Sequence, residues 1–171
     1  REGVDAVTAM SLSPTFGRIV ALAYVDGDED EAEPRSLVVP QGAETQADGA
    51  TIAAERELLQ AFWLLATNAE VVVTYNGRSF DVPFLVARSL ALGVPVRDDL
   101  LGSPYSLRPH LDLMRFLGAG RSPGSLDAVC WSLGIESPKA DMTGADVASA
   151  YERGELGRIA EYNRQAVMAT A

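Results

Sequence analysis

The chain has 171 residues, of which 47% are hydrophobic and 22% are charged, and its formal net charge is −10. This length and composition are typical of one soluble globular domain with a substantial core. No apolar run approaches the ~20 residues of a membrane span and no signal peptide is visible, so we expect no membrane segment. The acidic balance argues against broad, non-specific binding of nucleic acid. The single cysteine excludes an internal disulfide and agrees with a cytoplasmic location.

The first part of the chain predicts a β-hairpin and then a long helix. Residues 18–25 and 35–39 are short apolar stretches that flank an acidic run, which is typical of a solvated loop. An antiparallel pair of strands is therefore expected. Residues 51–66 repeat apolar side chains mostly along one helical face, and Thr51 can cap that helix.

A strand, a turn and a second helix follow. The β-branched run within residues 70–75 predicts a buried strand, and Asn76-Gly77 ends it because glycine tolerates the positive φ of a turn. Apolar residues recur at helical spacing from Asp81 to Gly93, where the helix stops. The strand thus brings polar residues to one end of a sheet, where ligands bind in open α/β folds.

The rest of the chain predicts short elements joined by glycine- and proline-rich loops. They are a strand at 110–113 and helices at 125–133, 144–151 and 156–171. No internal repeat or linker is present, so residues 1–171 are interpreted as a single α/β domain.

Several other residues receive structural interpretations. Cys130, Trp63 and Trp131 lie in apolar helical patterns and are predicted to be buried. His110, the only histidine, is expected to be hydrogen-bonded in a structural role. For Asp112, acceptance of a backbone N–H at a strand end is favoured over an approach to an acidic site.

The acidic excess falls mostly in residues 1–75, so a phosphate-binding surface is expected on the second half of the chain. Its candidate residues are arginines, although a single surface arginine is usually only solubilising. They are Arg78, Arg88, Arg108, Arg115, Arg121 and Arg164.

Asp81 alone could be an ordinary helix N-cap. Its setting changes that interpretation, because Asn76, three residues, and then Phe80-Asp81 on a strand-to-helix turn resemble the second motif of the 3′-5′ exonucleases of the DEDD superfamily. The whole chain resembles the predicted 3′-5′ exonucleases related to the proofreading domain of family B DNA polymerases. The resemblance rests on five blocks in order, at residues 12–21, 74–85, 105–113, 133–139 and 159–162.

The resemblance implies a ribonuclease-H-like mixed sheet flanked by helices, and removal of nucleotides from a DNA or RNA 3′ end. The family uses two divalent ions, Mg²⁺ or Mn²⁺, which prefer oxygen ligands and stabilise the attacking and leaving oxygens of a phosphodiester. By resemblance, Asp81 is a metal ligand and Tyr162 helps to place the attacking water. Asn76 and Phe80 are candidate contacts to the terminal nucleotide, and the equally weighted alternatives are a turn former and a core aromatic. Arg78 is a candidate substrate-binding residue.

Two parts of the family pattern are missing. Ala166 stands four residues after Tyr162, where the family has an aspartate, and a methyl group cannot bind a metal. The family's Asp-x-Glu strand is absent before Ser11, and we expect it upstream, because without it the sheet would have two exposed edges. Impaired turnover is therefore expected. The alternatives are a catalytically inactive nucleic-acid-binding or scaffolding module of the same fold, and an α/β domain that binds a protein partner.

Overall fold

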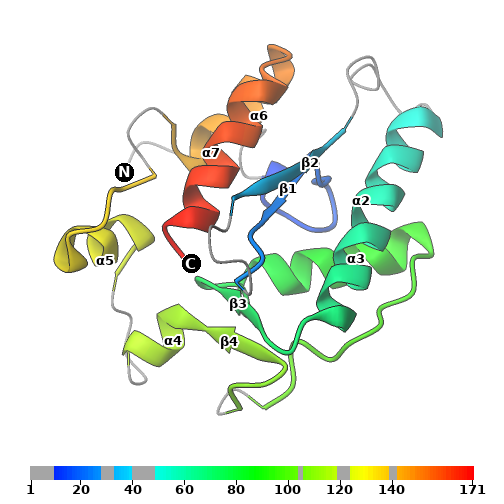
Figure 1. The fold of residues 1–171 in the computed structure, drawn as a ribbon. Coiled ribbons are helices and arrows are strands. Elements are labelled where there is room, and N and C mark those ends of the chain that lie inside the picture. The colour runs from blue at the N-terminus through cyan, green and yellow to red at the C-terminus, as the bar shows by residue number, and fades with distance from the viewer. Residues whose placement is uncertain (1–9, 28–32, 40–48, 104–105, 119–123, 139–141) are drawn as a thin grey trace.

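The structure is a computed structural model that describes residues 10–27, 33–39, 49–103, 106–118, 124–138 and 142–171 (Figure 1). Its elements are β1 (Ala21–Tyr24), β2 (Arg35–Val38), α2 (Gly49–Asn68), β3 (Val72–Thr74), α3 (Asp81–Leu92), β4 (His110–Asp112), α4 (Leu113–Gly118), α5 (Leu126–Leu133), the 3₁₀ helix η1 (Gly144–Asp146), α6 (Val147–Glu152) and α7 (Leu156–Met168). The predicted α/β fold class and the order of its elements are confirmed. Within the described residues, no helix combines the length and apolar character needed to cross a membrane.

The strands form two pairs. β1 pairs antiparallel with β2, with Ala21 opposite Val38, which confirms the predicted hairpin. β3 pairs parallel with β4, with Thr74 beside Asp112. No hydrogen-bonded strand among the described residues joins β1 to β3, so the expected sheet is present as two separate two-stranded sheets.

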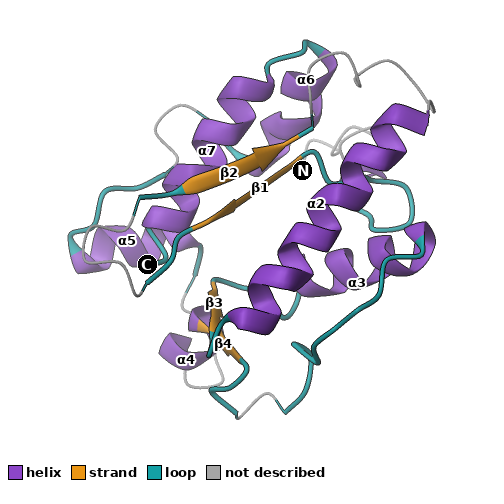
Figure 2. Ribbon diagram, turned by 45° about the vertical axis from the view of Figure 1, so that its right-hand side comes forward, coloured by secondary structure: helices purple, strands orange, loops and turns teal. Residues whose placement is uncertain are grey.

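The main core lies between α2 and α3, which run close together beside the strands (Figure 2). Trp63 of α2 is completely buried, as predicted, and its indole N–H donates to the buried hydroxyl of Ser89 on α3 at 2.8 Å. This bond satisfies the polar atom of an otherwise apolar side chain, so Trp63 fixes the two helices against each other.

A buried ion pair adds a second link between the same helices. Both guanidinium nitrogens used by Arg88 lie 2.8 Å from the carboxylate oxygens of Glu55, whose side chain is only 3% exposed. Glu55 Oε1 also accepts the backbone N–H of Ile19 at 2.9 Å. The pair therefore ties α2, α3 and the chain just before β1 into one unit.

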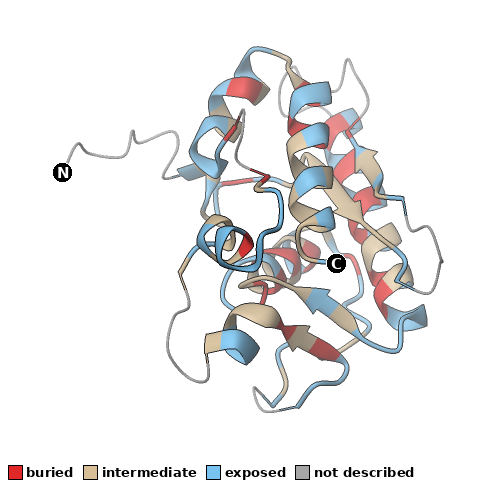
Figure 3. Ribbon diagram, turned by 60° about the vertical axis from the view of Figure 1, so that its left-hand side comes forward, coloured by how far each residue is buried: buried red, intermediate tan, exposed pale blue. Residues whose placement is uncertain are grey.

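The hairpin is covered by the last helix. α7 packs against β1 and β2 (Figure 2), and a cluster of Met142, Ala150, Leu156 and Ile159 meets Val20 and Ala21 at this contact. Along the helices, buried residues alternate with exposed ones, as expected for amphipathic helices around a core (Figure 3). α7 ends at Met168, so the predicted helix 156–171 is slightly too long.

Two burial predictions were wrong, whereas that of Cys130, like that of Trp63, was confirmed. Trp131 is 85% exposed, because the eight-residue helix α5 buries only the face that carries Cys130, which is 1% exposed as predicted. In the predicted buried strand, Val71 and Val73 are 36% and 43% exposed. Val71 and Val73 are two residues apart and lie on the same face of the extended chain, so their exposure shows that the described residues leave this face largely uncovered.

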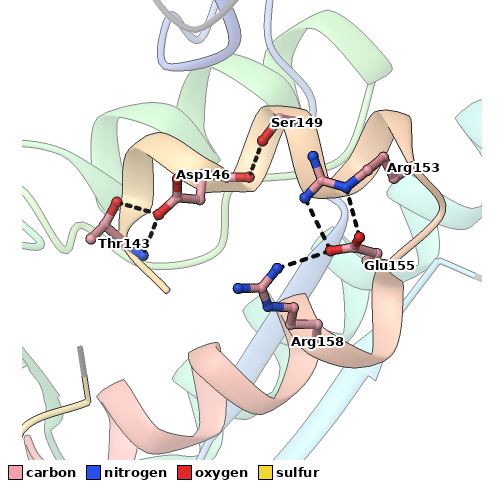
Figure 4. A network of polar contacts seen from close by, with 6 residues as sticks. All are labelled: Thr143, Asp146, Ser149, Arg153, Glu155 and Arg158. Atoms are coloured by element: carbon pink, nitrogen blue, oxygen red, sulfur yellow. Dashed lines mark hydrogen bonds and ion pairs between the residues drawn. The ribbon is translucent and has the colours of Figure 1, made fainter. Parts of the chain in front are cut away.

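The junction between α6 and α7 is held by exposed polar contacts (Figure 4). Glu155 accepts hydrogen bonds from Arg153 at 2.6 and 3.1 Å and from Arg158 at 3.1 Å. Before it, Thr143 and Asp146 form a reciprocal capping box at the start of η1. These contacts orient the first turn of α7.

The two arginines lower the pKa of Glu155 to about 2, so this carboxylate is expected to stabilise the fold in a pH-dependent way. A lowered folded-state pKa means that the contribution is complete above the unfolded pKa of about 4.3 and disappears as the pH falls towards 2. The melting temperature of Glu155→Gln should therefore lie slightly below that of the wild type at pH 7 and converge with it near pH 2. A Glu136→Gln variant, which removes an exposed carboxylate elsewhere, is the control. An unchanged difference across this pH range would contradict the assignment.

Candidate functional site

The turn between β3 and α3 carries four of the predicted site residues, and its shape follows from local constraints. Asn76 has a φ of 64°, a left-handed conformation that asparagine tolerates better than most residues. A Cβ on Gly77 would lie 2.3 Å from Thr74 Oγ1, so only glycine fits there. The N–H groups of Ser79 and Phe80 both donate to the carbonyl of Asn76, at 3.1 and 3.2 Å. The turn is therefore compact and internally bonded.

Asp112, at the end of β4, supports this turn from the neighbouring strand. Its Oδ1 accepts the N–H groups of Asn76 at 2.9 Å and Met114 at 3.1 Å, and its Oδ2 accepts the N–H of Arg78 at 3.0 Å. The side chain is buried, and all of these donors are backbone groups. The structure thus confirms the favoured prediction that Asp112 accepts backbone N–H groups at a strand end.

Arg78 does not lie where the prediction placed it. The residue is 8% exposed, and its guanidinium donates to the carbonyls of Gly102 at 3.0 Å and His110 at 2.9 Å. A guanidinium held by two backbone carbonyls inside the protein cannot also face a substrate phosphate at the surface. We therefore correct the predicted substrate-binding role, and assign Arg78 to the internal support of the turn.

His110 completes the support. The ring is completely buried, with Nδ1 2.8 Å from the carbonyl of Leu100 and Nε2 2.8 Å from Thr74 Oγ1. Burial lowers the pKa of His110, and the positive charge of Arg78 acts in the same direction. A neutral ring that donates from Nδ1 to the carbonyl and accepts the threonine hydroxyl at Nε2 satisfies both contacts. The predicted structural role of His110 is confirmed.

Phe80 and Asp81 lie at the outer end of the turn. The Phe80 ring is 41% exposed, and its centroid is 6.1 Å from that of Phe84. Asp81 is exposed and is the first residue of α3, while Phe80 occupies the N-cap position with no side-chain capping bond. The N-cap interpretation of Asp81 is therefore wrong, and its carboxylate is not used to start the helix.

The environment of Asp81 disfavours its negative charge. The surrounding protein raises the pKa of this carboxyl by desolvation, a backbone N–H of the residue itself partly offsets the rise, and the charge of Asp112 adds to it. A carboxylate in such a place gains more than usual from a nearby cation.

Tyr162 and Ala166 lie on α7, one turn apart on the same side of the helix. Tyr162 packs against the cluster beside the hairpin, and burial and the charge of Asp146 raise the pKa of its hydroxyl. It lines an open cavity of about 370 Å³ together with Met142, Arg158, Glu161 and Gln165. Asn76, Phe80 and Asp81 do not line this cavity. The structure thus brings these three residues together at the turn between β3 and α3, but it does not place Tyr162 with them.

The residues described do not fit the two-metal centre that the resemblance implies. No three His, Cys, Asp or Glu side chains among them lie close enough to hold a metal ion. Asp81 is the one candidate ligand, since Asp112 is committed to three backbone N–H groups and Ala166 offers only a methyl group. Further oxygen ligands would have to come from outside this set.

Some support of the turn has no signal in the sequence. The carbonyls of Leu100 and Gly102 hold His110 and Arg78, but any residue type supplies a carbonyl. The hydroxyl of Tyr75 donates to the carbonyl of Gly124 at 2.8 Å and so ties the turn to the start of α5. Only the tyrosine beside the asparagine could have pointed to this contact.

Comparisons with known proteins find relatives among DNA polymerases. The DNA polymerase of Pyrococcus glycovorans is 29% identical over 132 residues, which cover 67% of this chain and 17% of that polymerase. The DNA polymerase of Pyrococcus horikoshii is 28% identical over 132 residues, covering 67% of this chain and 11% of the polymerase. The chain therefore spans less than a fifth of the length of these relatives.

A solved structure and a family model extend the match to nearly the whole chain. The family B DNA polymerase from the hyperthermophilic archaeon Pyrobaculum calidifontis has a similar fold, with a TM-score of 0.60 and 22% identity, over 95% of this chain and 21% of that protein. A family model described as a predicted 3′-5′ exonuclease related to the exonuclease domain of PolB matches residues 11–171. The chain thus belongs to this family of predicted exonucleases related to the PolB exonuclease domain.

Proposed function

We propose that this chain is a 3′-5′ exonuclease-like domain that acts on the 3′ end of a DNA or RNA strand by phosphodiester hydrolysis. The observation that carries the proposal is the turn from Asn76 to Asp81. It presents the exposed ring of Phe80 and the carboxylate of Asp81, which is not an N-cap, at the carboxyl end of β3. Membership of the exonuclease family supports the same reaction class.

Each proposed contact residue has a role that its chemistry can supply. The ring of Phe80 offers a stacking surface to the terminal base, and the side-chain amide of Asn76 offers donors and an acceptor to the nucleotide. Asp81 would be a ligand of Mg²⁺ or Mn²⁺, and its unfavourable charge would be relieved by a cation. Tyr162 would orient water, a role that rests on the family pattern rather than on its cavity.

The proposed activity is impaired in this chain. Ala166 removes one family ligand, and the described acids do not complete the site. We propose that the missing acidic pair belongs to a strand that would lie in space between β1 and β3 and join their sheets. Among the described residues, these two strands lie in separate sheets. A cytoplasmic location stays a prediction.

A second candidate is a catalytically inactive module that binds a nucleic-acid strand or serves as a scaffold. Ala166 and the lack of an acidic cluster among the described residues favour it. The two candidates differ in whether restoring one carboxylate on α7 restores hydrolysis.

Ala166→Asp in the full-length protein tests the proposal directly. A 5′-labelled single strand is incubated with Mn²⁺, and products are followed on a gel. We expect the wild type to be slow or inert and the variant to shorten the strand from its 3′ end. Ala169→Asp, which adds the same charge at the C-cap of the same helix, should not do so.

The other outcomes also decide between the candidates. If both proteins are inert but bind the strand, the inactive module replaces the exonuclease proposal. If neither Mn²⁺ nor the oligonucleotide raises the melting temperature of either protein, both nucleic-acid proposals are contradicted and a protein-partner role is favoured.

A further inference from the structure

The contacts of Asp112 converge on the turn that presents the proposed site. The parallel register places Asp112 beside Thr74, the last residue of β3, so its carboxylate lies next to the chain that follows. Two of its three accepted hydrogen bonds come from Asn76 and Arg78. The third, from Met114, orients the carboxylate from the start of α4.

The turn depends on these bonds because its conformation is unfavourable by itself. A non-glycine residue at positive φ, such as Asn76, persists when its surroundings determine it. Without the carboxylate, the N–H groups of Asn76 and Arg78 would lose the acceptors that they have in a largely buried place. The side chain of Arg78 holds the same turn from the other direction, through Gly102 and His110.

The same hydrogen bonds exclude phosphate binding by the N–H groups of Asn76 and Arg78. N–H groups that converge on one point form an anion site in many loops. Here the anion is the protein's own carboxylate, which lies within 3.0 Å of the two donors. A substrate phosphate is therefore not bound by these N–H groups, and contact with the substrate is left to the side chains of Asn76, Phe80 and Asp81.

We propose that Asp112 is a positioning residue: its buried carboxylate holds the turn from Asn76 to Phe80 in the shape that presents Phe80 and Asp81 to a 3′-terminal nucleotide. The claim that the turn presents Phe80 and Asp81 to a nucleotide rests on the proposed function. The claim that Asp112 holds the turn, called the clamp below, rests on its hydrogen bonds to the N–H groups of Asn76 and Arg78 alone.

Hydrogen exchange of the wild-type protein tests the clamp first. The amides of Asn76 and Arg78 should exchange slowly although Ser79 and Phe80 beside them are exposed. Fast exchange of both amides would overturn the clamp without any variant, so a variant that fails to fold does not leave the question open.

Asp112→Asn then removes one acceptor with little change of shape. Its amide group cannot replace both carboxylate oxygens, so protection of at least one of the two amides should fall about tenfold or more, while protection in α2 stays as in the wild type. Glu57→Gln is the control, because Glu57 is exposed on α2, apart from the turn and from the loop whose carbonyls hold Arg78 and His110. Equal protection in Asp112→Asn and the wild type would overturn the clamp.

Strand binding tests the positioning role. Fluorescence anisotropy of a 5′-fluorescein single strand in Mn²⁺ should show an affinity several-fold weaker for Asp112→Asn than for the wild type and Glu57→Gln. Unchanged binding together with lost protection would overturn positioning and leave the clamp. If the wild type itself does not bind the strand, the proposed function and the positioning role are overturned together, and the exchange data still decide the clamp.

Discussion

Replacing Arg88 with methionine is expected to lower the free energy of unfolding by about 3–5 kcal/mol. The carboxylate of Glu55 is 3% exposed and Arg88 is its only charged partner in the contacts described. Without the guanidinium, a negative charge would remain buried between α2 and α3, still bound by the Ile19 N–H but otherwise uncompensated. The cost comes mainly from this stranded charge rather than from the loss of the pair.

The double variant Glu55→Gln with Arg88→Met separates these two causes. The amide oxygen of glutamine can still accept the Ile19 N–H, and neither side chain carries a charge. Urea unfolding should therefore show that the double variant recovers most of the stability lost by Arg88→Met alone. Equal losses in the single and double variants would show that the pair itself, and not the stranded charge, stabilises the fold.

Local patterns predicted the elements of this fold better than they predicted which faces are covered. Trp63 and Trp131 lie in similar apolar helical patterns, yet one is buried and the other is 85% exposed. The difference is tertiary: α2 packs against α3 and the strands, whereas α5 is a short helix that buries little beyond Cys130. Periodicity shows that a helix has an apolar face, but another element must be there to cover it.

Arg78 shows the same limit within the site. Arg78 was a candidate for phosphate contact because the acidic excess lies in the first half of the chain, which leaves the second half for a phosphate-binding surface. Its actual partners are carbonyls 24 and 32 residues away in the sequence, which only the pairing of β3 with β4 brings near. Asp112 was easier to predict, since a strand-end aspartate has backbone N–H groups close by in any fold of this class.

The family pattern and the structure of α7 together indicate what Ala166 changes in this chain. Tyr162 and Ala166 lie on one side of α7, four residues apart like the tyrosine and aspartate of the family pattern, and α7 is continuous from Leu156 to Met168. The turn that carries Asp81 is held by its hydrogen bonds to Asp112. The loss on α7 is therefore confined to a side chain, which is why restoring that side chain is an informative experiment.

Asp81→Asn, introduced into the Ala166→Asp protein, is expected to lower the restored rate of strand shortening by about 100-fold or more. Asparagine keeps the size of the side chain but removes the charge that would attract a divalent cation. The measurement is kcat/KM for the labelled single strand in Mn²⁺, with Glu57→Gln in the same background as the control.

Stability measurements show whether such a loss is functional. Because the folded-state pKa of Asp81 is raised, its ionised form is less favourable in the folded protein than in the unfolded chain at neutral pH. Asp81→Asn should therefore leave the melting temperature unchanged or raise it at pH 7. A rate loss with a lowered melting temperature would indicate damage to α3, and an unchanged rate would remove Asp81 from the proposed site. Only a large rate loss in a fold of equal or greater stability supports its role as a ligand.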